Sequence, residues 1–553
     1  MKQIYKYLVP ALLVVFLQSA SLMAQWNGNP DTPLEICSYS GNQTNPQIIA
    51  DGSDGFFIFW LDNRNINIAI YGQHLNKYGL ALWEENGRAI LDDPAINYSH
   101  VQALLNYDND ILIGWQSASA GGYEDTLYAA KLNADGDLLW PAPVKIAGNN
   151  ISTGGSYWGP VEFNMIEIEN NYYFGIVLTG YGYNFLSINK ITENGTLPWG
   201  YNGYQVPDIV SAGNIKLLPD GAGGCFMKWD YYHSYLQRFD ENGNLLWPSP
   251  VDINNCTSGT GGTYAGFPYC LIESDGAGGI MSAWSSLTDD IYAADIDANG
   301  SLVFDDDCIP VYMDAYAQEE ISFSKSGDNY YVGWVDSRPD AIGIYMQKFN
   351  QDGEIQWAEE LYVEDTSIYV PVIKSITTSE GDIAIFYQAA GAFYAQKIHP
   401  DGTTEWAQPI EVLSDYYQPF YTHYELHTAE NGNVVGVAET VSISGDPNVY
   451  AFNLNFSGGD TLSADTTGTA IYSFKEKINI YPNPADQFAE MEQSAENEVR
   501  FELYDINGKL IMNYTFTGEE KIDLSQVKNG MYYIHFKYAD RDEIQKLIVM
   551  HNF

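Results

Sequence analysis

A unit of about 50 residues recurs along this chain, and its fixed internal spacing constrains the fold more than any other feature. In each clear unit an aromatic residue is followed eight positions later by glycine, and four positions after that by a second aromatic residue. Six units show the full spacing: Tyr71…Gly79…Trp83, Tyr128…Gly136…Trp140, Tyr235…Gly243…Trp247, Tyr292…Gly300…Phe304, Tyr345…Gly353…Trp357 and Tyr394…Gly402…Trp406. Alternating apolar and polar residues around an Asp-Gly or Asn-Gly pair predict a β-hairpin with strands on both sides of the turn.

Two further units are degenerate. One keeps Gly195 and Trp199 but has Ser187 at the first aromatic position, and the last has Tyr450 and Gly458 without a closing Trp. An additional apolar strand ends in Trp upstream of five hairpins, so each unit offers about four short strands, as in a propeller blade. We therefore predict an all-β chain whose residues 25–460 form an eight-bladed β-propeller, with seven blades as the alternative.

The second aromatic residue of each hairpin is expected to dock one blade on the next, because a large ring buries much apolar surface. These blade-docking residues are Trp83, Trp140, Trp199, Trp247, Phe304, Trp357 and Trp406. The segment Leu34–Ser38 is expected to pair with the last blade, since closing the ring removes the exposed edge strands of an open array.

The N-terminus has the pattern of a secretory signal peptide, and we place it at residues 1–24. Lys2 and Lys6 precede an apolar run, and small residues surround Ala24. No later stretch has the roughly 20 apolar residues of a membrane span, so no transmembrane segment is expected after signal removal. The five Cys residues allow one or two disulfides, with Cys256 and Cys270 nearest in sequence, or burial as small apolar side chains.

The chain is strongly acidic. It has 25 basic and 72 acidic residues, a formal net charge of −47 at pH 7, and no basic patch. Such a surface repels a phosphate backbone, so no nucleic-acid partner is expected. The acidity agrees with a secreted protein that meets glycans, other proteins or divalent cations.

The composition changes near residue 460, which predicts a linker at 461–472 and a second domain at 473–553. Strands that alternate cleanly around Val499–Tyr504, and again after the turn at 528–530, predict a small Ig-like antiparallel β-sandwich. An ordinary Ig-like adhesive module is one interpretation of this domain.

The order of short motifs in this domain favours a more specific interpretation. Tyr-Pro-Asn-Pro-Ala at 481–485, Leu-Tyr-Asp-Ile-Asn-Gly-Lys at 503–509, Gly-Met-Tyr-Tyr at 530–533 and Lys-Leu-Ile-Val at 546–549 occur in succession. In this the domain resembles the type A sorting domains of the type IX (Por) secretion system of Bacteroidetes. The resemblance rests on Pro482, Asn483, Pro484, Asp505, Gly508, Lys509, Gly530, Tyr533 and Lys546. It implies that the type IX machinery is a partner and that the protein crosses the periplasm and outer membrane to be secreted or held at the cell surface.

One segment has the spacing of a calcium loop. Asp295, Asp297 and Asn299 match the start of an EF-hand-like loop, so they are the candidate metal ligands. They also coincide with the fifth hairpin turn, where Asp and Asn are typical for reasons of turn geometry alone. His423, Glu425 and His427 would share one face of a strand and give a second candidate for metal, although a surface strand explains them equally. No other cofactor is indicated.

Two arginines occupy matching repeat positions, in Trp60-Leu-Asp62-Asn-Arg64 and Trp334-Val-Asp336-Ser-Arg338. Because a catalytic group normally belongs to a single blade, we expect these Asp/Arg pairs to stabilise strand ends. The favoured function is a surface or secreted binding protein for a glycan or protein, and no catalytic residue is assigned. The alternative is a polysaccharide hydrolase or lyase with carboxylates at the propeller funnel. The sequence leaves enzymatic activity undecided, with the balance toward none.

Overall fold

The protein is described here by a computed structural model. Residues 33–454 and 479–551 are described, apart from 54, 66, 78, 120–124, 149–158, 181–182, 208, 210–211, 256–269, 287–289, 340, 366–371, 390–391, 414–418, 429–432, 442–446, 482–486, 493–498, 506–508, 517–518, 538–541 and 550. The chain divides into two compact units, Met1–Ser457 and Gly458–Phe553, here called the propeller unit and the tail unit. The predicted signal peptide and linker lie outside the described residues, so their boundaries stay predictions.

The described residues of the propeller unit form eight four-stranded antiparallel sheets, which we number in chain order. Sheet 1 contains β2 (Gln43–Ala50), β3 (Phe56–Asp62), β4 (Ala69–Leu75) and β5 (Arg88–Leu91). Sheet 2 contains β6 (Ile96–Leu105), β7 (Ile111–Ser119), β8 (Asp125–Leu132) and β9 (Val144–Gly148). Sheet 3 contains β10 (Gly159–Ile168), β11 (Asn171–Gly180), β12 (Tyr183–Thr192) and β13 (Tyr204–Gln205). Sheet 4 contains β14 (Gly213–Pro219), β15 (Cys225–Tyr231), β16 (His233–Phe239) and β17 (Val251–Asp252).

The second half repeats the pattern. Sheet 5 contains β18 (Leu271–Ser274), β19 (Ile280–Ser285), β20 (Ile291–Ile296) and β21 (Ile309–Tyr312). Sheet 6 contains β22 (Gln318–Ser326), β23 (Asn329–Asp336), β24 (Gly343–Asn350) and β25 (Leu361–Asp365). Sheet 7 contains β26 (Ile373–Thr377), β27 (Ile383–Ala389), β28 (Ala392–Ile398) and β29 (Ile410–Leu413). Sheet 8 contains β30 (Pro419–Thr428), β31 (Val434–Val441), β32 (Pro447–Leu454) and, from the other end of the unit, β1 (Leu34–Cys37).

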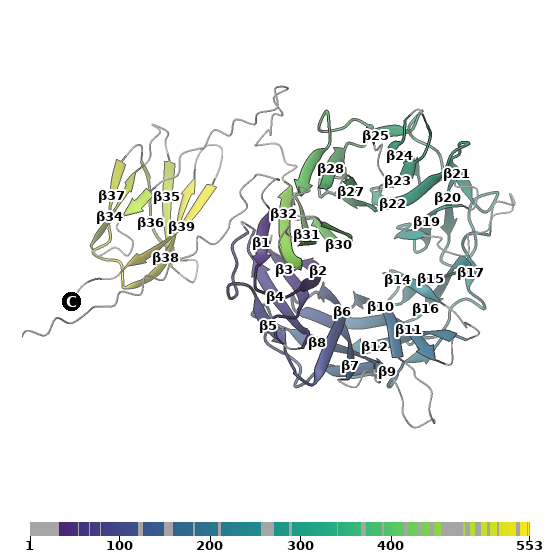
Figure 1. The fold of residues 1–553 in the computed structure, drawn as a ribbon, viewed down its shortest axis with the longest axis horizontal. Coiled ribbons are helices and arrows are strands. Elements are labelled where there is room, and N and C mark those ends of the chain that lie inside the picture. Colours follow the sequence, from purple (N-terminus) through teal and green to yellow (C-terminus); the bar gives the residue numbers. More distant parts are fainter. Residues whose placement is uncertain are drawn as a thin grey trace, which may run out of the picture. The chain divides into compact units, whose positions relative to one another are not determined.

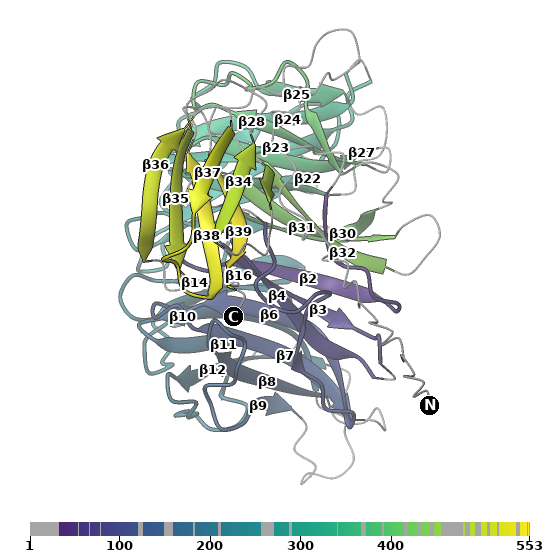
Figure 2. The ribbon, with the colours of Figure 1, turned by 90° about the vertical axis from the view of Figure 1, so that its left-hand side faces the viewer.

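The sheets follow one another around a closed ring, which makes this unit a β-propeller (Figure 1). The first strands contact their neighbours around the centre, as β2 does with both β6 and β30. Within sheets 1 to 7 the strands follow chain order from the centre outward, and Figure 2 shows β6, β7, β8 and β9 in this succession. The ring closes where β1 pairs antiparallel with β32, with Leu34 opposite Ala451, which confirms the predicted pairing of this segment.

Burial on both faces explains the sequence of the second strands. Every residue of β3 is buried, and its run Phe-Phe-Ile-Phe-Trp-Leu-Asp is apolar almost throughout because a sheet covers each face. The cores lie between adjacent sheets: Phe59 of sheet 1 packs in one cluster with Ile113 and Trp115 of sheet 2. Burying one such side chain contributes about 1.5–3 kcal/mol relative to leaving it in water.

The structure differs from the predicted hairpin on one side of the turn. After the turn glycine, the segment makes only a single bridge, such as Leu132 with Leu138, and the fourth strand begins later, at Val144 in sheet 2. Leu138 and Leu139 are exposed, whereas the following Trp140 is buried. The chain leaves the strand direction here because Trp140 turns toward the neighbouring sheet, so a period-2 pattern over Leu-Leu-Trp did not indicate a regular strand.

The cysteines are mostly buried thiols. Cys308 is disulfide-bonded, whereas Cys37, Cys225 and Cys270 are free and buried. A bridge between Cys256 and Cys270, the nearest pair in sequence, is therefore not formed. Burial raises the pKa of Cys37 to about 11 and that of Cys270 to about 12, so both thiols stay protonated near pH 7.

The tail unit is an antiparallel sandwich, as predicted. One sheet contains β33 (Asn479–Tyr481), β34 (Phe488–Glu492) and β37 (Glu519–Asp523), and the other β36 (Leu510–Phe516), β35 (Val499–Asp505), β38 (Gly530–Lys537) and β39 (Asp542–Val549). Ala489 and Ile522 of the first sheet pack in one core with Phe501 and Ile534 of the second. In the parts of the chain that are described, no helix has the length and apolar character that a membrane span requires.

Candidate functional site

The predicted docking aromatics lie against the hairpin turn of the next sheet. In six cases the ring comes within 2.8–3.2 Å of the place that a Cβ on the turn glycine would take. The pairs are Trp83 with Gly136, Trp140 with Gly195, Trp199 with Gly243, Trp247 with Gly300, Phe304 with Gly353, and Trp357 with Gly402. These glycines also have φ between 78° and 87°, so any side chain there would be both strained and in collision with the ring.

Several indoles also donate a hydrogen bond across the same interface. Trp140 Nε1 donates to Glu193 O at 2.8 Å, and Trp247 Nε1 donates to Ala298 O at 3.2 Å. Trp406 is half-buried in the core between sheets 7 and 8. The aromatic–glycine spacing of the repeat therefore serves to pack neighbouring sheets against each other.

The candidate calcium residues belong to the fifth hairpin turn and the strand before it. Asp297 Oδ1 accepts hydrogen bonds from Asn299 N and Ser301 N, both at 2.8 Å. Asn133, which is uncharged, makes the same two bonds in sheet 2, with Asp135 N at 3.0 Å and Asp137 N at 2.9 Å. Turn geometry thus accounts for Asp297 and Asn299.

Asp295 differs from its two neighbours. It lies on β20 with 6% of its surface exposed, and its Oδ1 has no hydrogen-bond partner. Within the described ranges, no group of three or more His, Cys, Asp or Glu residues is arranged to hold a metal ion.

The residues of the second candidate for metal lie on the strand β30. Glu425 lies on β30, 3.6 Å from Lys374 Nζ, and His427 Nδ1 lies 2.9 Å from Thr428 O. Burial lowers the pKa of His427. Nothing is described of the side chain of His423.

The enzyme alternative expects catalytic carboxylates near the centre of the ring. Two of the carboxylates there accept hydrogen bonds from the backbone of the neighbouring sheet. Glu162 on β10 accepts from Asn214 N at 2.9 Å and from Ile215 N at 2.7 Å, at a bulge of β14. Glu439 on β31 accepts from Asn45 N at 3.0 Å, at the matching bulge of β2. These two carboxylates satisfy backbone amides that the bulges leave unpaired.

The two Asp/Arg motifs form the strand-end ion pairs that the sequence predicts. Arg64 Nη2 lies 2.6 Å from Asp62 Oδ2, and Arg338 Nη2 lies 2.8 Å from Asp336 Oδ2. Both aspartates are fully buried, and each accepts from the indole of the preceding Trp, at 2.8 Å in sheet 1 and 3.3 Å in sheet 6.

The surroundings of the two arginines differ. Arg338 also donates to Glu360 Oε1 at 2.8 Å and to the Tyr312 hydroxyl at 2.7 Å, and its Nε donates to Asp336 Oδ1 at 2.9 Å. Arg64 instead has a buried Nε without a partner, and its Nη2 donates to Asn86 O at 2.7 Å.

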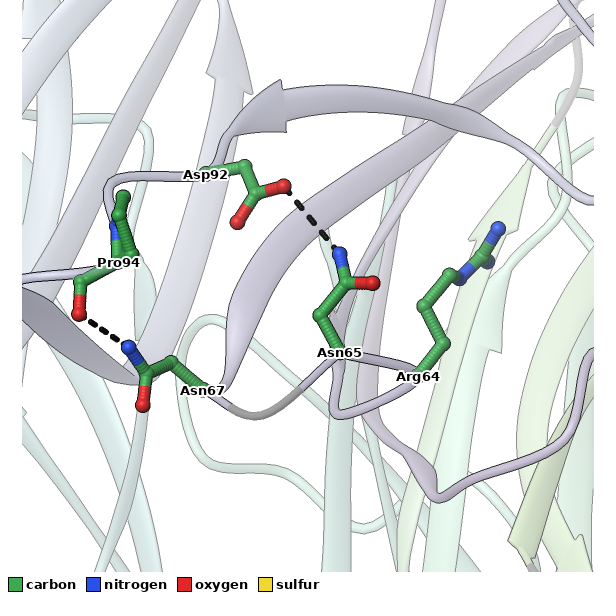
Figure 3. Close-up of a pocket in the computed structure, with 5 residues that line it drawn as sticks. All are labelled: Arg64, Asn65, Asn67, Asp92 and Pro94. Atoms are coloured by element: carbon green, nitrogen blue, oxygen red, sulfur yellow. Dashed lines mark hydrogen bonds between the residues drawn. The ribbon is translucent and has the colours of Figure 1, made fainter.

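A cavity of about 600 Å³ opens beside Arg64 (Figure 3). Arg64, Asn65 and Asn67 reach it from the connection between β3 and β4, and Asp92 and Pro94 from the connection between β5 and β6. Asn65 Nδ2 donates to Asp92 Oδ2 at 3.3 Å, and Asn67 Nδ2 donates to Pro94 O. We call these five residues the sheet 1 pocket.

An aromatic residue lies next to this pocket. The Arg64 guanidinium carbon is 3.9 Å from the centre of the Tyr71 ring and 4.7 Å from that of Tyr39, and Tyr39 is 50% exposed. Sequence reasoning identified Arg64 only as a structural residue and missed the pocket. The available signal was the Asn-rich connection Asn63-Arg64-Asn65-Ile66-Asn67, which the matching segment of sheet 6, Ser337-Arg338-Pro339-Asp340-Ala341, lacks.

The described sorting-motif residues lie at strand ends and in the strand pairing of the tail unit. Asp505 ends β35, Lys509 precedes β36, Gly530 begins β38, and Tyr533 on β38 pairs with Lys546 on β39. Pro482, Asn483, Pro484 and Gly508 lie outside the described residues.

Comparison with known proteins gives a family model for the tail and solved structures of similar fold for most of the chain. No curated protein matches the chain. Similar solved structures include the WD40 domain of SCAP from fission yeast, with 11% identity, coverage of 77% of this chain and 98% of that one, and a TM-score of 0.41. Polysaccharide lyase Uly1 is similar at 10% identity, with coverage of 78% of this chain and 94% of that one and a TM-score of 0.37. An α-L-arabinanase of Penicillium chrysogenum complexed with arabinobiose is similar at 8% identity, with coverage of 77% of this chain and 98% of that one and a TM-score of 0.32.

Residues 479–550 match the family model of the secretion system C-terminal sorting domain. The match covers most of the tail unit and includes every motif on which the resemblance to type IX sorting domains rests. The tail unit is therefore a secretion system C-terminal sorting domain, which directs the protein through type IX secretion to the cell surface or the extracellular space.

Proposed function

We propose that the propeller is a secreted or surface-held binding protein whose ligand is a glycan, taken up at the sheet 1 pocket. The observation that carries the proposal is the lining of this pocket: a guanidinium, two carboxamides and a single carboxylate, Asp92. Carboxamides both donate to and accept from sugar hydroxyls, the guanidinium donates to them, and the carboxylate accepts from them. Its volume of about 600 Å³ is within the range typical of small-molecule sites.

The position of Tyr39 supports a sugar ligand. Its half-exposed ring lies beside Arg64, which holds one ring face by a cation–π contact. An exposed aromatic ring with a polar group at its edge offers an apolar face on which the C–H groups of a sugar can pack.

The lining also favours binding over hydrolysis. Glycoside hydrolases of the usual kinds use two carboxyl groups, about 5–5.5 Å or 6.5–9.5 Å apart. Asp92 is the one acidic residue among the five that line the pocket, and it already accepts from Asn65. The described lining residues therefore offer groups for recognition and one carboxyl group, where the reaction requires two.

The test is a glycan-array screen of the full mature chain with and without calcium, followed by calorimetry and product analysis for each hit. The double variant Asn65→Ala/Asn67→Ala should weaken binding by about 10-fold or more, since each lost hydrogen bond contributes about 1 kcal/mol. Asn242→Ala, in an exposed hairpin turn of sheet 4, is the matched control and should bind as the wild type does.

Two results would overturn the proposal. Equal glycan affinity in wild type and double variant would place the site elsewhere. Sugar release in the product analysis would favour the hydrolase or lyase alternative.

A further inference from the structure

One position in the repeat holds a basic residue in six sheets and an acidic residue in sheet 5. It is the third residue after the aromatic residue that opens the hairpin, or after Ser187 in sheet 3. The basic residues are His74, Lys131, Lys190, Arg238, Lys348 and Lys397 in sheets 1, 2, 3, 4, 6 and 7. Asp295 is the matching residue of sheet 5.

In four of these sheets the cation pairs with an aspartate at or near the turn between the first two strands. The nitrogen–oxygen distances are 2.9 Å for His74–Asp51, 2.8 Å for Lys131–Asp110, 2.9 Å for Arg238–Asp220 and 2.9 Å for Lys397–Asp382. The cation neutralises a carboxylate that the surrounding strands partly bury.

Sheet 5 has the same turn aspartate as sheet 4. Asp275 Oδ1 accepts from Ala277 N at 2.6 Å and Gly279 N at 2.8 Å. In sheet 4, Asp220 Oδ1 accepts from the two equivalent amides at 2.8 Å, and its Oδ2 takes the hydrogen bond from Arg238. The place of that arginine is taken in sheet 5 by Asp295, a second carboxylate.

The two carboxylates of sheet 5 are both 6% exposed, and Oδ1 of Asp295 has no hydrogen-bond partner. Burial, with the charges of Asp275 and Asp297, raises the pKa of Asp295 to about 6. Lys325, the nearby cation on β22, donates to Ser274 O at 2.9 Å instead of pairing with either aspartate. The Tyr330 hydroxyl, also from sheet 6, donates to the same carbonyl at 3.4 Å.

We propose that Asp275 and Asp295 bind a metal cation of the calcium class in sheet 5, in the place of the cationic side chain that the other sheets supply. Both carboxylates are buried and the charge of Asp275 acts on Asp295, so the two repel. A cation between them removes the repulsion and supplies the missing partner of Asp295. Calcium prefers carboxylate oxygens and completes its shell with carbonyl oxygens and water, so it does not need a third acidic side chain. This site differs from the loop that the sequence indicated, because Asp297 and Asn299 are engaged in the turn.

The test is thermal unfolding of the full mature chain at pH 7.5 and constant ionic strength, first without metal and then with 1–10 mM calcium. Binding with a dissociation constant near 1 mM, typical of weak extracellular sites, should raise the Tm by roughly 0.5–1.5 °C over this calcium range. Asp295→Asn should lose this shift. Asp295→Lys should also lose it and should unfold at a higher temperature than wild type without metal, because it restores the ion pair of the other sheets.

The matched control is Asp240→Asn, which removes one turn carboxylate from the hairpin of sheet 4 and should keep the calcium shift. Equilibrium dialysis should find one calcium ion fewer in Asp295→Asn than in wild type. Equal shifts and equal stoichiometry in wild type and Asp295→Asn would overturn the proposal.

A proton could instead be the partner. In that case calcium would have no effect, and the Tm of wild type would rise relative to that of Asp295→Asn as the pH falls from about 6 to 4, because the raised pKa of Asp295 opposes folding fully above the folded value and ceases to oppose it only below the unfolded value of 3.8. That outcome would also overturn the cation site. The proposal does not depend on the glycan site of sheet 1.

Discussion

Sheets 1 and 6 contain the same Trp-x-Asp-x-Arg motif, yet one arginine is saturated and the other is not. Arg338 has partners on Asp336, Glu360 and Tyr312. Arg64 has Asp62 but keeps its Nε unpaired and lies beside a cavity. The comparison teaches that the motif itself is structural and that the residues around it decide whether a surface remains for a ligand.

One repeat position explains much of this difference. Glu360 comes three residues after Trp357, and its counterpart three residues after Trp83 is Asn86. Glu360 offers a carboxylate to the arginine, whereas Asn86 offers only its backbone carbonyl. A carboxylate forms the stronger, charge-assisted bond, so Arg338 has a second anionic partner that Arg64 lacks.

The largest expected effect comes from the buried aspartates. Asp336→Ala removes the acceptor of Arg338 and of the Trp334 indole, and Asp62→Ala does the same for Arg64 and Trp60. Each should lower the free energy of unfolding by about 3–5 kcal/mol, because the change breaks an ion pair to a fully buried carboxylate and leaves the indole without its acceptor. Urea unfolding followed by tryptophan fluorescence measures this in the propeller alone, since all 13 Trp residues precede residue 458. A loss below about 1 kcal/mol would show that the motif is not structural.

Replacing the two arginines should lower the free energy of unfolding by different amounts, unlike replacing the two aspartates. Arg338→Met leaves two carboxylates, Asp336 and Glu360, without a cation, whereas Arg64→Met leaves only Asp62. Methionine keeps most of the packing against the tyrosine rings, so the difference reports the polar partners. We expect a loss of about 3 kcal/mol for Arg338→Met and about half of that for Arg64→Met. Equal losses in the same urea experiment would contradict the distinction between a saturated and an unsaturated arginine.

The lowered pKa of Asp336 in sheet 6 should make the stability of the propeller depend on pH in the acid range. Burial acts to raise the pKa of Asp336, but the hydrogen bonds from Arg338 and the Trp334 indole outweigh it and hold the pKa below its ordinary value of 3.8. A lowered pKa stabilises the fold above the unfolded value, and the stabilisation is lost as the pH falls through the lower, folded value. The stability advantage of wild type over Asp336→Asn should therefore be constant from pH 7 to 5 and shrink below about pH 4. An advantage that persists unchanged at pH 2.5 would contradict this account.

The repeat spacing made the fold predictable from the sequence, but it gave no information on the candidate sites. Regular spacing reveals the sheets because the turn glycine and the docking aromatic must recur wherever two sheets pack, as Gly136 and Trp83 do. A binding site depends on departures from the repeat, such as Asn86 in sheet 1 where sheet 6 has Glu360, or Asp295 in sheet 5 where other sheets have a basic residue. Each departure is a single residue, and the sequence alone does not distinguish it from the ordinary variation between repeats. The pocket also joins Arg64 to Asp92, which lie in different connections, and their proximity follows only from the sheet.

The smallest expected effects separate ligand binding from stability in the two sheets. Tyr39→Ala removes a half-exposed ring from Arg64 and should weaken glycan affinity by about 3-fold to 10-fold, while unfolding changes by less than about 0.5 kcal/mol. Tyr312→Phe in sheet 6 removes the hydroxyl that accepts from Arg338, and should lower the free energy of unfolding by about 1 kcal/mol without any change in glycan affinity. Calorimetry and urea unfolding on both variants give the two readouts. If Tyr312→Phe lowered the glycan affinity and Tyr39→Ala did not, the ligand would bind at sheet 6. The number of hydrogen-bond partners of the arginine would then not distinguish a structural ion pair from a binding site.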